Sequence, residues 1–180
     1  MESLPVGAEA RLKELGIELP GMQPAIGNYL ATKRHGDLVF VAGHGPLRLE
    51  QLSGDLVDGY IPLGEGIHAL IQGRVGEDLT LEEAKVAARN TTLVVLSSLR
   101  HELGSLDEIT SFLKVFGMVN CAPGFNQFAA VIDGCSDLLV EIFGEEIGKH
   151  ARSAVGMAAL PLDISVELEM IVAVRPLSPN

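Results

Sequence analysis

The chain has 180 residues, of which 47% are hydrophobic and 21% charged, a composition typical of one globular domain and not of a disordered segment. Its 13 basic and 24 acidic side chains give a net charge of −11 with no basic cluster, which argues against nucleic acid or an anionic membrane as the main partner. The mean hydropathy of +0.30 is high for a soluble monomer, so either the core is unusually complete or, as we favour, another subunit covers part of the surface.

The first residues lack the basic start and apolar stretch of a secretory signal, and no run of about 18 apolar residues occurs. We therefore expect a cytoplasmic protein in which Cys121 and Cys135 are reduced, buried thiols. The five histidines, at positions 35, 44, 68, 101 and 150, show no metal-ligand spacing, and the glycines form neither a P-loop nor a dinucleotide fingerprint. We expect no metal and no cofactor.

A short helix is predicted over residues 6–15, where Gly16 ends it. Residues 27–33 and 38–42 flank a turn-like His-Gly-Asp triplet at 35–37, and residues 39–41 are an apolar run typical of a buried strand. This pattern predicts a β-hairpin.

Residues 46–75 are rich in glycine and leucine and predict an irregular insertion that contains a strand over 67–75. Together with an N-terminal extension over 1–20, this insertion adds to a smaller core. No composition shift or linker divides the chain, so residues 1–180 are expected to form a single domain.

The clearest helix is predicted over residues 81–103. It follows Thr80, which forms a capping box with Glu83, and it ends at Gly104 in the position typical of a helix C-terminus. A strand is predicted next, over 108–119.

A connector that contains Asp133 and Gly134 is predicted to lead into a second helix over residues 137–143, which Ser136 caps and Gly144 ends. Two further strands, over 152–159 and 165–174, complete the chain. This order of elements predicts an α+β fold, a mixed β-sheet with two helices packed on one face. No third layer remains to cover the other face of the sheet, so we expect other subunits to cover it.

Strand side chains alternate between the two faces of a sheet. In the last strand one face is wholly apolar and is expected to enter the core: Val166, Leu168, Met170, Val172 and Val174. The opposite face mixes the carboxylates of Glu167 and Glu169 with apolar side chains. That mixture is typical of a cleft or a subunit contact.

Three side chains are candidates for a functional site. The guanidinium of Arg152 suits a carboxylate ligand, although an ion pair with Glu167, Glu169 or a neighbouring chain explains it equally well. A partly buried Glu167 could move protons, whereas a charged edge strand is the alternative. Tyr29 could form a pocket wall or be an ordinary half-buried tyrosine.

Several motifs resemble the reactive intermediate deaminase (Rid), or YjgF-like, family. The C-terminal A-R-S-A-V, then L-P, then V-E-L-E-M-I, is similar to the signature of that family. A-I-G-N-Y resembles the family's A-I-G-P-Y, and V-F-V-A-G-H resembles a family strand that ends in S-G-Q. The likeness covers most of residues 22–175, and the chain is similar to a longer branch of the family.

The resemblance implies a chorismate-mutase-like fold and a homotrimer with three clefts between its subunits. It implies hydrolysis of enamine or imine intermediates to a 2-oxo acid and ammonia, without a cofactor. In this chain Arg152 would hold the substrate carboxylate and Glu167 would hold or activate the attacking water. Tyr29 would wall the cleft, and Gly43 and Ala154 would offer backbone groups.

The chain also departs from the family pattern. Ala154 stands where many relatives have cysteine, Asn28 where proline is usual, and His44 where glutamine is usual. A non-catalytic trimeric protein that binds carboxylate metabolites is therefore the alternative function. An endoribonuclease, a label some relatives have carried, is weaker because the chain has no basic groove.

Overall fold

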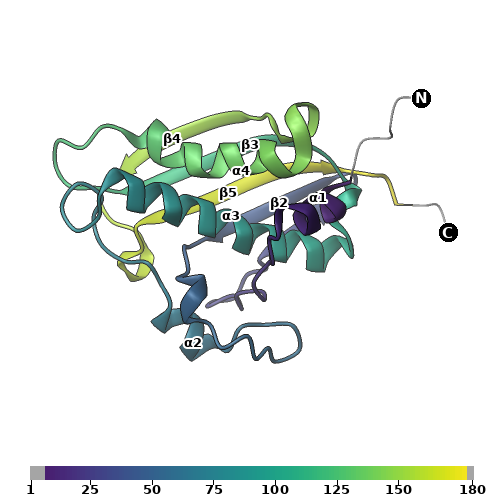
Figure 1. Cartoon of the computed structure of the whole chain (residues 1–180), viewed down its shortest axis with the longest axis horizontal. Coiled ribbons are helices and arrows are strands. Elements are labelled where there is room, and N and C mark those ends of the chain that lie inside the picture. The colour runs from purple at the N-terminus through teal and green to yellow at the C-terminus, as the bar shows by residue number, and fades with distance from the viewer. Residues whose placement is uncertain (1–6, 178–180) are drawn as a thin grey trace.

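The computed structural model describes residues 7–177, in which four α-helices accompany one five-stranded sheet (Figure 1). The strands are β1 (Thr32–His35), β2 (Leu38–His44), β3 (Ile109–Asn120), β4 (Ala151–Met157) and β5 (Val166–Val174). The helices are α1 (Ala8–Leu15), α2 (Leu63–His68), α3 (Leu81–Leu103) and α4 (Phe128–Gly148). Single 3₁₀ turns occupy η1 (Leu49–Gln51), η2 (Leu106–Glu108) and η3 (Pro161–Asp163).

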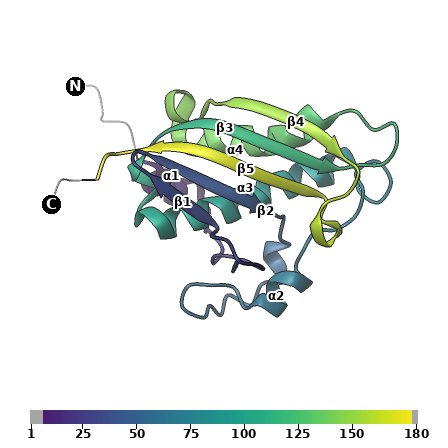
Figure 2. The ribbon, with the colours of Figure 1, turned by 180° about the vertical axis from the view of Figure 1, so that it is seen from behind.

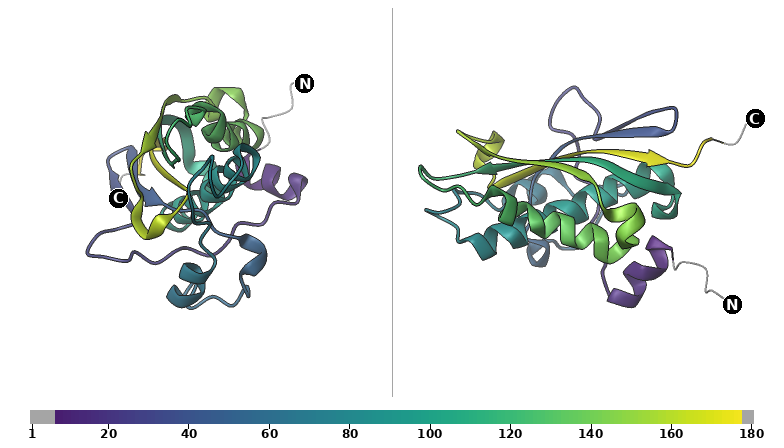
Figure 3. Two further views of the ribbon diagram at one scale, coloured as in Figure 1. Left: turned by 90° about the vertical axis from the view of Figure 1, so that its left-hand side faces the viewer. Right: turned by 90° about the horizontal axis from the view of Figure 1, so that it is seen from above.

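The sheet has the strand order β1-β2-β5-β3-β4. Only β3 and β4 run parallel, and all other neighbours are antiparallel. The long helices α3 and α4 lie together against one face (Figure 3), whereas the strands are uncovered when seen from behind (Figure 2). The predicted α+β fold, a mixed sheet with helices on one face, is confirmed.

The core lies between the sheet and the two long helices. The five apolar side chains of β5 predicted to enter it are at most 3% exposed. The predicted limits of α3 are confirmed as well, since the Glu83 amide donates to Thr80 Oγ1 and the Thr80 amide donates to Glu83 Oε2. Gly104 adopts a left-handed conformation, with φ of 79°, directly after the helix.

Helix α4 is much longer than predicted, because it begins at Phe128 and not after Ser136. Gly134, taken as part of a connector, lies inside the helix, where a Cβ atom would overlap the Lys85 carbonyl of α3. The glycine therefore permits close helix packing. Gly144 does interrupt the helical geometry, with φ of 73°, but one more turn follows it.

The strand predicted over 67–75 is wrong, because this part of the chain contains α2 and isolated bridges only. The first hairpin strand begins at Thr32, five residues later than expected. Segment 46–75 extends from the end of β2 away from the sheet (Figure 1). A second hydrophobic cluster anchors it, formed by Leu47, Ile61, Ala69 and Leu70 against Met118 and Ile164. That the segment is an insertion into a smaller core remains a prediction.

No helix within residues 7–177 is both long enough and apolar enough to cross a membrane.

Candidate functional site

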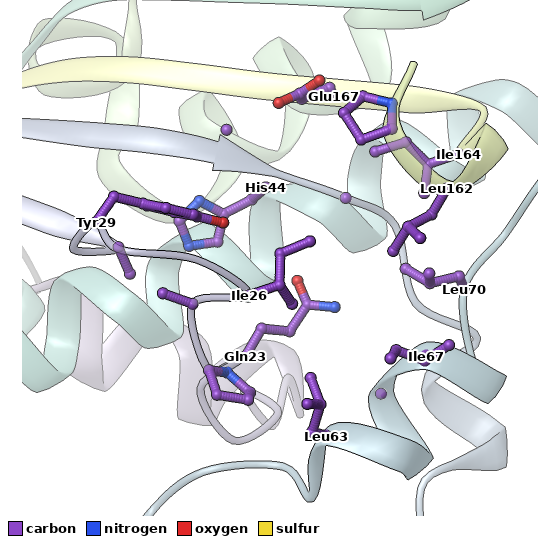
Figure 4. Close-up of a pocket in the computed structure, with 17 residues that line it drawn as sticks. Gln23, Ile26, Tyr29, His44, Leu63, Ile67, Leu70, Leu162, Ile164 and Glu167 are labelled. Carbon is purple, nitrogen blue, oxygen red and sulfur yellow. The ribbon is translucent and has the colours of Figure 1, made fainter. Parts of the chain in front are cut away.

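A cavity of about 140 Å³ opens where β2 and β5 meet segment 46–75 and the chain before β1 (Figure 4). Its walls come from five parts of the chain. The labelled lining residues are Gln23, Ile26, Tyr29, His44, Leu63, Ile67, Leu70, Leu162, Ile164 and Glu167. Gly43 lines it too.

Glu167 reaches the cavity from the face of β5 that carries no helices. Its neighbours Val166 and Leu168 are fully buried on the helix face, so alternation turns the carboxyl to the other side. The carboxyl lies over Gly43 of β2, where a Cβ atom would overlap Glu167 Oε1. The register between β2 and β5 shifts between Val41 and His44, so Gly43 sits in an irregular stretch of the ladder. Glycine at position 43 is thus required for the observed position of the carboxyl.

The environment of Glu167 favours its protonated form. Burial raises the pKa of the Glu167 carboxyl, and the nearby charge of Glu169 raises it further. No group in residues 7–177 donates a hydrogen bond or forms an ion pair with it. A half-buried carboxyl with a raised pKa is suited to accept and to donate a proton.

His44 has a structural part in the cavity wall. Its side chain is only 4% exposed, its Nδ1 lies 2.7 Å from the Ala42 carbonyl oxygen, and its Nε2 lies 2.8 Å from Ser98 Oγ. Because a carbonyl oxygen can only accept, Nδ1 donates to it and Nε2 accepts from the serine hydroxyl. Burial lowers the pKa of His44, which keeps the ring neutral. Both nitrogens are therefore occupied, and neither is free for a substrate.

Tyr29 lines this cavity and is 49% exposed, and its role as the wall of a substrate cleft remains a prediction. Gln23 points its amide into the middle of the cavity (Figure 4) and was not identified from the sequence. Its amide offers one acceptor and two donor hydrogens to a ligand.

Arg152 and Ala154 do not line this cavity within one chain. Arg152 lies opposite Val115 of β3, which is fully buried under the helices. Arg152 thus faces the helices, and its Nη1 donates to Asp133 Oδ1 at 2.8 Å and to Ser136 Oγ at 2.9 Å. Arg152 and Glu167 consequently lie on opposite faces of the sheet.

The contacts of Arg152 resolve one question the sequence left open. An ion pair exists, but its acid is Asp133 on α4, and not Glu167 or Glu169. Ser136, which was expected to cap a helix, instead contacts Arg152 and lies 3.0 Å from Nε2 of His150. Strand β4, which carries Arg152 and Ala154, is an edge strand whose free side can meet another chain.

The apolar part of the cavity was not predicted. Leu63, Ile67 and Leu70 come from the segment interpreted as irregular, and Leu162 comes from η3. No periodic pattern marks these residues, because they line the cavity through contacts between distant parts of the chain. Within residues 7–177 no group of three or more His, Cys, Asp or Glu side chains could hold a metal ion.

Comparison with known proteins identifies the family to which this chain belongs. Residues 9–173 match the family model described as "YjgF/chorismate_mutase-like, putative endoribonuclease". The chain is 36% identical to Protein TCP17 of Trypanosoma cruzi over 163 residues, which is 91% of each protein.

Two crystal structures are similar over nearly the whole chain. The protein Atu1372 of unknown function from Agrobacterium tumefaciens has a TM-score of 0.76 at 34% identity, with 93% of this chain and 92% of that one covered. A structure described as a "putative endoribonuclease" from Shewanella oneidensis has a TM-score of 0.78 at 28% identity, with 93% and 99% covered. The resemblance drawn from the sequence motifs is confirmed, and the chain belongs to the YjgF/chorismate mutase-like family.

Proposed function

We propose that the cavity beside Glu167 hydrolyses imines, or the enamines that tautomerise to them, to 2-oxo acids and ammonia. The observation that carries this proposal is the half-buried, unpaired Glu167 carboxyl with its raised pKa at one end of a mainly apolar cavity. A carboxyl with a raised pKa is suited to transfer protons, and an imine is electrophilic enough to need little more than a positioned water and a proton-transfer group.

The reaction balances with water alone. R–C(=NH₂⁺)–COO⁻ and H₂O give R–CO–COO⁻ and NH₄⁺. Glu167 in its ionised form would accept a proton from the attacking water as the C–O bond forms and then return it to the nitrogen. As the C–N bond breaks, the remaining hydroxyl proton would pass to the departing ammonia, which leaves as NH₄⁺. Because Gly43 has no side chain, the Glu167 carboxyl can lie directly against β2, at the edge of the cavity.

A substrate carboxylate needs a cation, and no lysine or arginine of residues 7–177 lines the cavity. We propose that Arg152 and Ala154 on the edge strand β4 of a neighbouring copy complete the site in a homotrimer. This arrangement would explain why Arg152 lies on the edge strand β4, whereas Glu167 lies on the central strand β5. Asp133 would weaken the clamp, because it partly neutralises the guanidinium.

The engagement of Arg152 with Asp133 and Ser136 favours a second candidate, binding of small molecules without turnover. In that case Arg152 stabilises the packing of α4 on β4, and the cavity binds an apolar metabolite. Cleavage of RNA has less support: the net charge is −11 and no basic side chain lines the cavity in residues 7–177.

A coupled assay tests the proposal. A pyridoxal-phosphate dehydratase acting on threonine releases an enamine that tautomerises to an imine, and formation of the 2-oxo acid is timed with and without the protein. We expect an acceleration that Arg152→Ala reduces by about tenfold or more. No acceleration with any imine, combined with a ligand-induced rise in melting temperature, would establish the binding role instead. If Arg152→Ala accelerates the reaction as much as the unmodified protein does, Arg152 does not bind the substrate carboxylate across a subunit interface.

A further inference from the structure

We infer that the proposed site selects imines that carry a bulky apolar side chain, branched or aromatic, over small ones, and that α2 is the specificity element. This inference rests on the proposed function and deepens it. The observation that carries it is the distribution of polar and apolar groups along the cavity.

The polar groups of the cavity lie on its sheet side and in its middle, where the Gln23 amide points, whereas the wall formed by α2 is apolar (Figure 4). Glu167, Tyr29 and His44 lie together beside the sheet, whereas Leu63 and Ile67 of α2 lie at the far end (Figure 4). A substrate whose C=N group is next to Glu167 would therefore direct its side chain towards α2. A small side chain would leave that apolar wall without contacts.

The size of the cavity sets the size of the side chain. A dry apolar cavity of about 150 Å³ holds a molecule of benzene. The present cavity is about 140 Å³ and opens to the surface, so an apolar group of about that size fits within it if the carboxylate of the substrate lies at the mouth.

The apolar wall is held in place by contacts outside the cavity. Ile61 and Ala69, on either side of α2, are at most 2% exposed. The ring of Tyr60 packs on His101 of α3 with centroids 5.8 Å apart, and the Ile61 amide donates to the Met22 carbonyl. Since the wall is preformed, its contacts contribute to selectivity without a cost of ordering α2.

The kinetic test compares imines made by an amino-acid oxidase from leucine and from alanine, with catalase present and the imine measured by competition with semicarbazide. We expect a kcat/KM about tenfold or more higher for the leucine-derived imine. Ile67→Ser and Leu63→Ser should each reduce this preference by about threefold or more. Val86→Ser is the matched control, because Val86 is a similarly exposed apolar residue on a helix, 53% against 43% for Ile67, and lies outside this cavity.

A binding test separates this inference from the proposed function. Dissociation constants of 4-methyl-2-oxopentanoate and pyruvate for the unmodified protein should differ by about tenfold in favour of the larger ligand. If no imine is hydrolysed but this difference is found, the proposed reaction fails and the apolar selectivity stands. If imines are hydrolysed but kcat/KM for the alanine-derived imine equals or exceeds that for the leucine-derived imine, the selectivity is overturned and the reaction stands. Equal binding of both 2-oxo acids also overturns it.

Discussion

Glu167 and Arg152 lie on opposite faces of one sheet and differ in how well their charges are satisfied. Arg152 donates to Asp133 and Ser136 and packs beneath α4. Glu167 has no donor in residues 7–177 and stands beside an apolar cavity, with its pKa raised by burial. Both residues belong to the motif that carries the family resemblance.

The difference indicates which group awaits a ligand. A partly buried charge without a partner is unfavourable for stability, so its persistence points to a role in binding or catalysis. A charge that already has two partners can be explained by stability alone. Glu167 is therefore the stronger candidate for chemistry, and Arg152 needs a second chain to take part in it.

The largest expected effect is that of Glu167→Gln on activity. Loss of a proton-transfer group typically lowers the rate by 10²–10⁴-fold, so kcat/KM for imine hydrolysis should fall by about that factor. Glu169→Gln is the matched control, on the same face of β5 but outside the cavity. Because it removes only the smaller cause of the raised Glu167 pKa, its kcat/KM should stay within about threefold of that of the unmodified protein. Equal losses in both variants would exclude a specific role for Glu167.

Gly43→Ala should displace the Glu167 carboxyl, because the added methyl group would overlap Oε1. A misplacement of about 1 Å in a reacting group can cost about 100-fold in rate, and we expect a loss of 10- to 100-fold in kcat/KM. Gly64→Ala in α2 is the control, since a Cβ atom there meets nothing within 4 Å. Unchanged activity in Gly43→Ala would show that the carboxyl position is not critical.

Asp133→Asn distinguishes a structural Arg152 from one that also binds substrate. Loss of this half-exposed ion pair should lower the free energy of unfolding by about 0.5–1 kcal/mol, as measured by urea denaturation. If Arg152 also clamps a carboxylate, removal of the competing acid should lower KM about two- to fivefold. A loss of stability with unchanged KM would leave Arg152 with the structural role alone.

The smallest effect concerns stability and pH. Since the pKa of Glu167 is raised in the folded protein, ionisation of this group disfavours folding. The loss of stability that this ionisation causes is absent at pH values below 4.5, the ordinary pKa of the group, and is complete at pH values above the pKa of Glu167 in the folded protein. Relative to the unmodified protein, Glu167→Gln should gain stability as the pH rises from 4 to 7, by an amount that solvent screening keeps small. Urea denaturation measures the free energy of unfolding of both proteins. A difference between them that stays constant from pH 4 to pH 7 would contradict the raised pKa.

The elements predicted correctly are those that local chemistry determines. The capping box of Thr80 and Glu83 and the left-handed Gly104 delimit α3 without help from the rest of the fold. Alternation along β5 determines which side chains enter the core and places Glu167 on the other face. Both features depend on residues close in sequence.

The elements missed depend on distant contacts. Helix α4 was predicted too short because Gly134 is typical of a turn, although it is the contact with α3 that requires glycine there. Helix α2 has two glycines and no capping side chain, so nothing local marks it. The candidate site shows the same division. Sequence motifs named Tyr29, Gly43 and Glu167 as candidates, whereas Ile67 and Leu162 line the same cavity only because the fold brings them there.

A crystal structure of the protein with bound 4-methyl-2-oxopentanoate tests the central claim most directly. We predict that the keto group lies within hydrogen-bonding distance of Glu167, that the branched tail contacts Ile67 of α2, and that Arg152 of a neighbouring copy contacts the ligand carboxylate. A ligand bound elsewhere, with the cavity beside Glu167 empty, would contradict the assignment of the site.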